Sequence, residues 1–255
     1  MLNLFKCEIY RISKTKSFWI LNLVLIFIAI MAPGFGGSIN QEEIMTATAA
    51  TGAMGFLVSL GSSMLYLIIV TIFIAGYVCD GFEQRTLQDS IAAGGGRGKI
   101  MLSKSLGVYV TAFVMLLVYS LTYMITIMIT QGANLGIEND VLLRMVLAFV
   151  AILIQNIAQA TLIILVAFAL KKVGIVMAIG ITFFTVGIML LSLGAYRYEW
   201  LAKIVDYTPF FGGQSITSSF TAPFGDYFSL IAINAVWIIA LLMATYSIFR
   251  KSELR

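Results

Sequence analysis

Few residues of this chain have the types and spacing that chemistry requires, and the most suggestive lie between Ala93 and Ile100. This glycine-rich segment with a lysine is similar to a phosphate-binding loop, whose backbone N–H groups surround a phosphate. That motif begins with Gly and ends with Ser or Thr, positions that Ala93 and Ile100 hold here. Apolar runs on both sides leave no room for the surrounding strand and helix. We therefore expect no nucleotide site, catalytic residue, metal or cofactor in the chain itself.

Uncharged polar side chains inside apolar runs form a second group of chemically capable residues. They recur at spacings of one, three or four and so share helix faces: Gln155, Asn156 and Gln159 in one run, and Tyr119, Thr122, Tyr123, Thr126 and Thr130 in another. In hydrocarbon such groups need hydrogen-bond partners. We favour a role in joining helices, and a polar patch along a substrate path is the alternative.

Three glycines in another apolar run recur every seven residues, at Gly180, Gly187 and Gly194. Seven residues make nearly two helical turns, so these glycines stay close to one face. Small residues let helices approach closely. The spacing predicts helix packing, either within one subunit or across a seam between two copies.

These polar residues lie in six apolar runs that are each long enough to cross a bilayer, which takes about 20 residues. The runs cover residues 17–35, 56–79, 105–130, 145–170, 173–195 and 228–249, and none contains Asp, Glu, Lys or Arg. The chain is 60% hydrophobic and 11% charged, against about 25% charged residues in soluble domains. We expect an all-α membrane protein with six transmembrane helices, forming one transmembrane domain over residues 1–255.

The basic residues are distributed unevenly around these runs. All but three of the 16 Lys and Arg residues flank the runs on one side, the exceptions being Arg144, Arg197 and Lys203. Because such residues concentrate in cytoplasmic loops, we expect a multi-pass plasma-membrane protein with both termini in the cytoplasm. The net charge of +4 then faces anionic lipid headgroups and not nucleic acid.

Two segments outside the runs carry helical patterns. Leu2, Phe5, Ile9 and Ile12 recur at steps of three and four, which predicts an amphipathic helix over residues 1–16 that lies in the membrane interface. The alternative is a first span with a long basic flank. The outer loop 196–227 holds another short amphipathic stretch ended by Thr208-Pro209, with Trp200 and Tyr207 as anchors at headgroup level.

The segment 80–104 is the largest one predicted in the cytoplasm. Its first half can form a short helix with Leu87 and Ile91 on one face and with Glu83, Arg85 and Asp89 facing water. Three glycines, 94–96, end that helix. Such a helix, tied to two spans, could dock into a groove of another protein. The alternative is a solvated loop whose charges only set the orientation.

This segment resembles the corresponding loop of ABC-2 type transporter permeases, in which E-x-x-G-T-x-x-x-L is followed by S-R-x-x-I/Y-x-x-S-K. The matching residues are Glu83, Thr86, Leu87, Ile91, Arg97, Ile100 and Lys104. Arg85 stands where that family has Gly, and Gly96 stands where Ser is common. The resemblance extends over the whole chain, from the basic amphipathic N-terminus to the long last outer loop.

The resemblance implies a type V exporter-like architecture and a bacterial source. It implies a separate ABC ATPase that binds ATP and Mg, and a second permease copy, identical or similar. The expected coupling residues are Glu83, Arg85, Thr86, Leu87, Asp89, Ile91 and Arg97. The cargo implied is amphipathic or antimicrobial peptides, or other hydrophobic compounds, and an uncharged cavity rich in aromatic and Met residues would suit it.

Two other classes of function remain as alternatives. A self-contained secondary transporter is disfavoured because ionisable residues inside spans form the proton and ion sites of such proteins, and the six runs lack them. A non-transporting membrane scaffold or sensor subunit is the second alternative. Co-purification with an ATPase and ATP-dependent transport in liposomes would separate the three.

Overall fold

The computed structural model of the chain describes residues 2–35, 51–61, 63–84, 86, 91, 96–131, 134, 139–213, 216–217 and 222–251. Within these ranges the chain is helical and has no strand. The helices are α1 (Leu2–Lys14), α2 (Lys16–Phe35), α4 (Gly52–Gly61), α5 (Ser63–Glu83), α7 (Arg97–Gln131), α8 (Asn139–Leu170), α9 (Val173–Thr182), α10 (Ile188–Arg197), α11 (Glu199–Asp206) and α13 (Phe224–Lys251).

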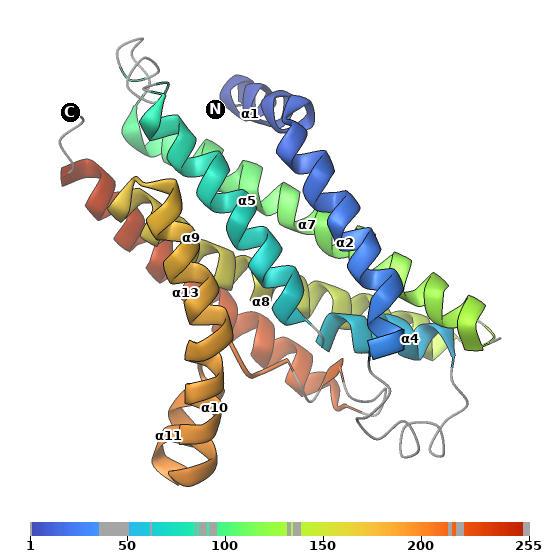
Figure 1. Ribbon diagram of the computed structural model, residues 1–255. Coiled ribbons are helices and arrows are strands. Elements are labelled where there is room, and N and C mark those ends of the chain that lie inside the picture. The colour runs from blue at the N-terminus through green and yellow to red at the C-terminus, as the bar shows by residue number, and fades with distance from the viewer. Residues whose placement is uncertain are drawn as a thin grey trace.

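Among the described residues, five helical stretches are long and apolar enough to cross a membrane, or six if the bent pair α1–α2 counts as one. The prediction of an all-α membrane protein is therefore confirmed at this level. The long helices run roughly side by side, with α8 between α5 and α13 (Figure 1). α1 and the C-terminal end of α13 lie at the same end of the bundle, which we call the terminal end, and α4 lies at the far end (Figure 1).

The amphipathic N-terminal helix is present as α1, and the chain bends by 61° between it and α2. The bend falls at Thr15, whose hydroxyl donates a hydrogen bond to the Arg11 carbonyl 2.8 Å away. The apolar face of α1 turns toward α7, because Ile12 is buried and an added Cβ at Gly107 would lie 3.1 Å from its side chain. α1 is therefore packed on the protein as well as being amphipathic.

The run expected as one span from Phe56 to Cys79 falls on two helices, α4 and α5. Gly61 ends α4, and a Cβ there would lie 2.8 Å from the Thr217 hydroxyl oxygen. The glycine thus lets the loop that precedes α13 approach the end of α4. This contact depends on a distant segment, so the local apolar pattern did not indicate it.

The fifth run also differs from a regular helix. A π-helical turn, Phe183–Gly187, separates α9 from α10. Beyond it, α10 has no buried residue, and α10 and α11 project together away from the long helices (Figure 1). The short amphipathic helix expected in loop 196–227 is present as α11, with Val205 buried and Trp200 and Tyr207 exposed.

Candidate functional site

Three aromatic side chains join the terminal ends of α5, α8 and α13. Phe82, Phe168 and Phe249 contact one another edge to face, with ring centroids 5.1 to 6.1 Å apart. Phe168 and Phe249 are fully buried. Such pairs add stability beyond their buried area. The segment 80–104 therefore starts from a helix end that is fixed to two other helices.

Glu83, an expected coupling residue, lies at the end of α5 and contacts the turn between α8 and α9. Its carboxylate accepts a hydrogen bond from the Val173 N–H, 3.3 Å away, at the first turn of α9. A negative charge is favourable at a helix N-terminus. In the same turn Lys171 has a φ of 58°, and its ammonium lies 5.8 Å from the ring centre of Phe82. Glu83 is solvent-exposed, as expected, and also links α5 to α9.

Arg97 starts α7 and holds the end of α13. Its guanidinium donates to the carbonyl oxygens of Arg250 (2.8 Å) and Phe249 (3.3 Å). The last carbonyls of a helix have no partner within the helix, so a cation there is favourable. Both ends of segment 80–104 are thus fastened to other helices, one through Phe82 and Glu83 and the other through Arg97.

The remaining expected coupling residues lie between these two ends. The Thr86 hydroxyl donates to the Gly81 carbonyl at 3.3 Å, and Ile91 is partly buried against the core. Arg85, Leu87 and Asp89 lie outside the described residues. The structure therefore describes the anchored ends of the expected docking segment and only part of its middle.

A buried charged cluster near the terminal end was not anticipated from the sequence. Lys104 of α7 is 1% exposed, and its ammonium lies 3.7 Å from a carboxylate oxygen of Glu8 in α1. The Tyr77 hydroxyl of α5 donates to the other oxygen of that carboxylate. Arg11 and Lys104 both lie over the Tyr77 ring, at 5.1 and 4.7 Å from its centre. Three helices, α1, α5 and α7, meet at this cluster.

In the sequence, Lys104 is one of the basic residues that flank the runs and one of the matches to the permease loop, and neither pattern indicates that it is buried. It lies one residue outside the expected span 105–130, yet helix α7 begins at Arg97 and carries Lys104 into the packed interior. A sequence signal did exist, since Glu8 is the one acidic residue of the N-terminal helix α1. A buried charge needs a partner, and Glu8 supplies it.

A cavity of about 610 Å³ opens beside this cluster, between α1, α2, α5 and α9. Its polar lining includes Arg11 and Asp80, and its apolar lining includes Phe73 and Met177. The uncharged cavity expected for hydrophobic cargo is therefore not what this region offers. The cavity combines a charged part with an apolar wall.

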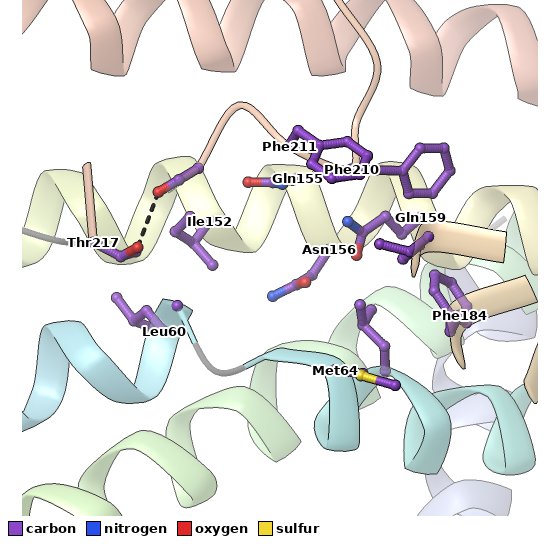
Figure 2. A pocket seen from close by; sticks show the side chains of 14 residues that line it. Leu60, Met64, Ile152, Gln155, Asn156, Gln159, Phe184, Phe210, Phe211 and Thr217 are labelled. Atoms are coloured by element: carbon purple, nitrogen blue, oxygen red, sulfur yellow. Dashed lines mark hydrogen bonds between the residues drawn. The ribbon is translucent and has the colours of Figure 1, made fainter. Parts of the chain in front are cut away.

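The amide residues of α8 line a different pocket, about halfway along that helix (Figure 2). Its volume is about 150 Å³, and its other walls come from the α4–α5 junction, the π-helical turn and the segment after α11. Gln155 and Gln159 both donate to the Pro209 carbonyl, at 3.1 and 2.6 Å. The sequence leaves the path of the outer loop open, and in the structure Pro209 of this loop lies against the middle of α8.

The polar residues of α7 are not part of this pocket. The hydroxyls of Thr122, Thr126 and Thr130 donate to carbonyls four residues earlier in their own helix, at 2.7 to 2.9 Å. Tyr119 and Tyr123 are buried, with ring centres 6.3 Å apart. The polar residues considered from the sequence as one patch therefore form two separate groups. The amides of α8 line a pocket, whereas the threonine hydroxyls of α7 donate to carbonyls of their own helix.

The three glycines at seven-residue spacing have three different neighbours. Gly180 lies against Thr71 of α5 so closely that a Cβ would overlap the Thr71 methyl group. An added Cβ at Gly194 would lie 2.7 Å from Leu201 of α11. Gly187 faces Phe183 of its own π-helical turn. Gly180 and Gly194 thus serve packing within the subunit.

Comparison of the chain with protein-family models found no matching family, and no curated protein matches it significantly.

Proposed function

We propose that this chain is the transmembrane permease subunit of an ATP-driven exporter of the ABC-2 type. Two permease copies, identical or similar, would combine with a separately encoded ABC ATPase that binds ATP and Mg. The protein would lie in a bacterial plasma membrane with both termini in the cytoplasm. Its cargo would be amphipathic or antimicrobial peptides, or other hydrophobic compounds moved out of the cell.

The observation that carries this proposal is the fastening of segment 80–104 at both ends. Phe82 and Glu83 connect its start to α8, α9 and α13, and Arg97 connects its end to α13. Discrete packed elements transmit displacement because close-packed interiors do not deform continuously. A force from an ATPase on this segment would therefore reach three other helices at once, α8, α9 and α13. A loop that only set membrane orientation would not need these attachments.

The test is charge reversal at Glu83, with the separate ABC ATPase of the proposed complex as the partner. Reversal at a partly desolvated contact costs about 2 to 5 kcal/mol, whereas an exposed pair is worth about 0 to 1 kcal/mol. Glu83→Lys should weaken ATPase association or separate ATP hydrolysis from transport in liposomes. Leu87→Asp should act similarly by placing a charge on the expected docking face.

Two controls make this test specific. Glu83→Gln keeps an acceptor for the Val173 N–H and should retain the helix contact while losing the charge. Reversal at Glu42 or Glu43, in the loop expected on the opposite side of the membrane, should leave assembly intact. Normal assembly and transport by both Glu83→Lys and Leu87→Asp would show that this segment does not couple to an ATPase. ATP hydrolysis by the isolated, pure chain would contradict the proposal altogether.

A secondary transporter is the second candidate, because the buried Lys104–Glu8 pair is an ionisable pair of the kind that ion-coupled transporters use inside the membrane. Both residues lie outside the six apolar runs, so the sequence argument against that class still holds for the runs themselves. Transport by the chain alone in liposomes, driven by a proton gradient without ATP, would favour this candidate. Dependence on ATP and on the ATPase would favour the first.

A further inference from the structure

The α8 pocket contains polar atoms whose hydrogen-bonding capacity is not used. Among the described residues, Gln155 Oε1, Gln159 Oε1 and Asn156 Nδ2 are buried without a hydrogen-bond partner, and these residues are 7%, 2% and 2% exposed. Figure 2 shows Asn156 extending toward Leu60 and Met64, with Gln155 and Gln159 on the side of Phe210 and Phe211. Unpaired buried polar groups are costly, so a ligand that pairs with them gains that energy.

The lining of the pocket limits the charge of such a ligand. None of the 14 residues around it is Asp, Glu, Lys or Arg. An ion placed there would lose its hydration without gaining an opposite charge. The ligand is therefore neutral.

The types of the three atoms define the ligand further. Two amide oxygens accept hydrogen bonds and one amide nitrogen donates. A carboxamide has the complementary set, because its N–H groups can donate to Gln155 and Gln159 while its carbonyl accepts from Asn156. The remaining walls are apolar, from Met64, Phe184 and other side chains. We infer that this pocket binds an uncharged primary carboxamide that carries a small apolar substituent.

The size of the pocket sets how much of a peptide it takes. Its volume of about 150 Å³ equals that of an engineered protein cavity that binds benzene. It therefore accommodates one amide group and a side chain of a few carbon atoms, and not a folded peptide. A role of this site in binding a carboxamide of peptide cargo rests on the proposed function. Binding of a small amide can be measured without an ATPase. The binding site and the proposed function can therefore be disproved separately.

The experiment compares two probes of nearly the same shape on the full chain in lipid nanodiscs. Isovaleramide carries a carboxamide, and methyl isobutyl ketone replaces its NH₂ by a methyl group. Saturation-transfer NMR, with empty nanodiscs subtracted, should give saturable binding of isovaleramide. The ketone should bind at least about tenfold more weakly, because it cannot pair with the two glutamine oxygens.

Variants locate the binding site. Gln155→Met and Gln159→Met should each reduce isovaleramide binding about tenfold. Gly213→Ala keeps all three amides but adds a Cβ that would lie 2.6 Å from Ile152 and overlap Gln155, so it should also reduce binding. Asn22→Leu removes a buried amide in α2, outside the pocket, and should leave binding unchanged. Unfolding midpoints of all variants verify that each is folded.

Three results would overturn the inference. The first is equal binding of the amide and the ketone, which would show that the pocket does not recognise the amide N–H groups. The second is binding by folded Gln155→Met, Gln159→Met and Gly213→Ala at the level of the parent. The third is no saturable binding of isovaleramide, which would leave the pocket with water only. Loss of ATP-dependent transport with normal isovaleramide binding would count against the proposed function and not against this site.

Discussion

The terminal end and the middle of the bundle differ in how their buried polar groups are paired. At the terminal end, charged groups contact one another and helix ends, as in the Lys104–Glu8 pair and the bonds of Arg97 to α13. Around the α8 pocket the polar groups are neutral amides, and part of their hydrogen-bonding capacity is unused. The two regions therefore differ in charge and in how far their buried polar groups are paired within the protein.

This contrast assigns different physical roles to the two regions. The charged contacts hold α1, α5, α7, α9 and α13 relative to one another at the end where segment 80–104 emerges. The neutral pocket has hydrogen-bonding atoms and a volume of about 150 Å³ available to a ligand. The proposed permease function would use both properties, a rigid attachment for force and an uncharged site for cargo. The predictions below test this contrast in order of decreasing effect.

The largest effect should come from leaving Lys104 without its carboxylate partner. Removing one partner of a buried ion pair costs about 3 to 5 kcal/mol, and Lys104 is 1% exposed. Glu8→Leu should therefore strongly lower the unfolding midpoint of the purified chain in detergent. The double variant Glu8→Leu with Lys104→Met should recover most of the loss, because no buried charge then remains.

Lys99→Met is the matched control, since Lys99 lies on the same helix and is exposed. It should change the midpoint little. If Glu8→Leu is no more harmful than Lys99→Met, the charged cluster does not hold the terminal end together.

The apolar periodicity predicted the helices of both regions but not their neighbours. The stripe from Leu2 to Ile12 indicated an amphipathic helix, and α1 is that helix. The same stripe suits a lipid interface or a protein surface equally, so it did not indicate that Ile12 lies on α7 at Gly107. A repeat within one helix reports which face is apolar and leaves open what covers it.

At the candidate sites, too, the sequence indicated which residues share a helix face but not which distant residues contact them. The spacing of Gln155, Asn156 and Gln159 indicated a shared polar face, and these residues do line one pocket. Their partner, the Pro209 carbonyl, comes from a loop whose path is set by tertiary packing. Glu8 and Lys104 meet for the same reason, because α1 folds back onto α7. The close approach of Thr217 to Gly61 at the end of α4 is likewise a contact with a distant segment.

An intermediate effect should follow from crowding the contact between α5 and α9, which joins the two regions. At Gly180 a Cβ would overlap the Thr71 methyl group and lie 3.3 Å from Ile163. Overpacking costs about 1 to 3 kcal/mol, so Gly180→Ala should lower the unfolding midpoint. Adding Thr71→Ser removes the obstructing methyl group and should restore part of the stability.

Gly174 provides the control on the same helix, because within the described part of the chain nothing beyond its own helix backbone and chain neighbours lies within 4 Å of an added Cβ there. Gly174→Ala should be neutral or slightly stabilising, since Ala favours helices over Gly. Equal losses from Gly174→Ala and Gly180→Ala would mean that helix propensity, and not the α5–α9 contact, determines the effect.

The smallest effect should come from a neutral hydrogen bond between helices. The hydroxyls of Tyr109 in α7 and Thr161 in α8 lie 2.8 Å apart, and such bonds in membrane proteins average about 0.6 kcal/mol. A double-mutant cycle of Tyr109→Phe and Thr161→Ala, read as unfolding free energies in detergent, should give a coupling of about that size. The Thr161 hydroxyl also donates to the Ile157 carbonyl, so Thr161→Ala leaves little that is newly unpaired in its own helix. A coupling as large as the loss from Glu8→Leu would mean that neutral bonds also fix the helices, and the contrast between the charged terminal end and the neutral middle would then lose its energetic basis.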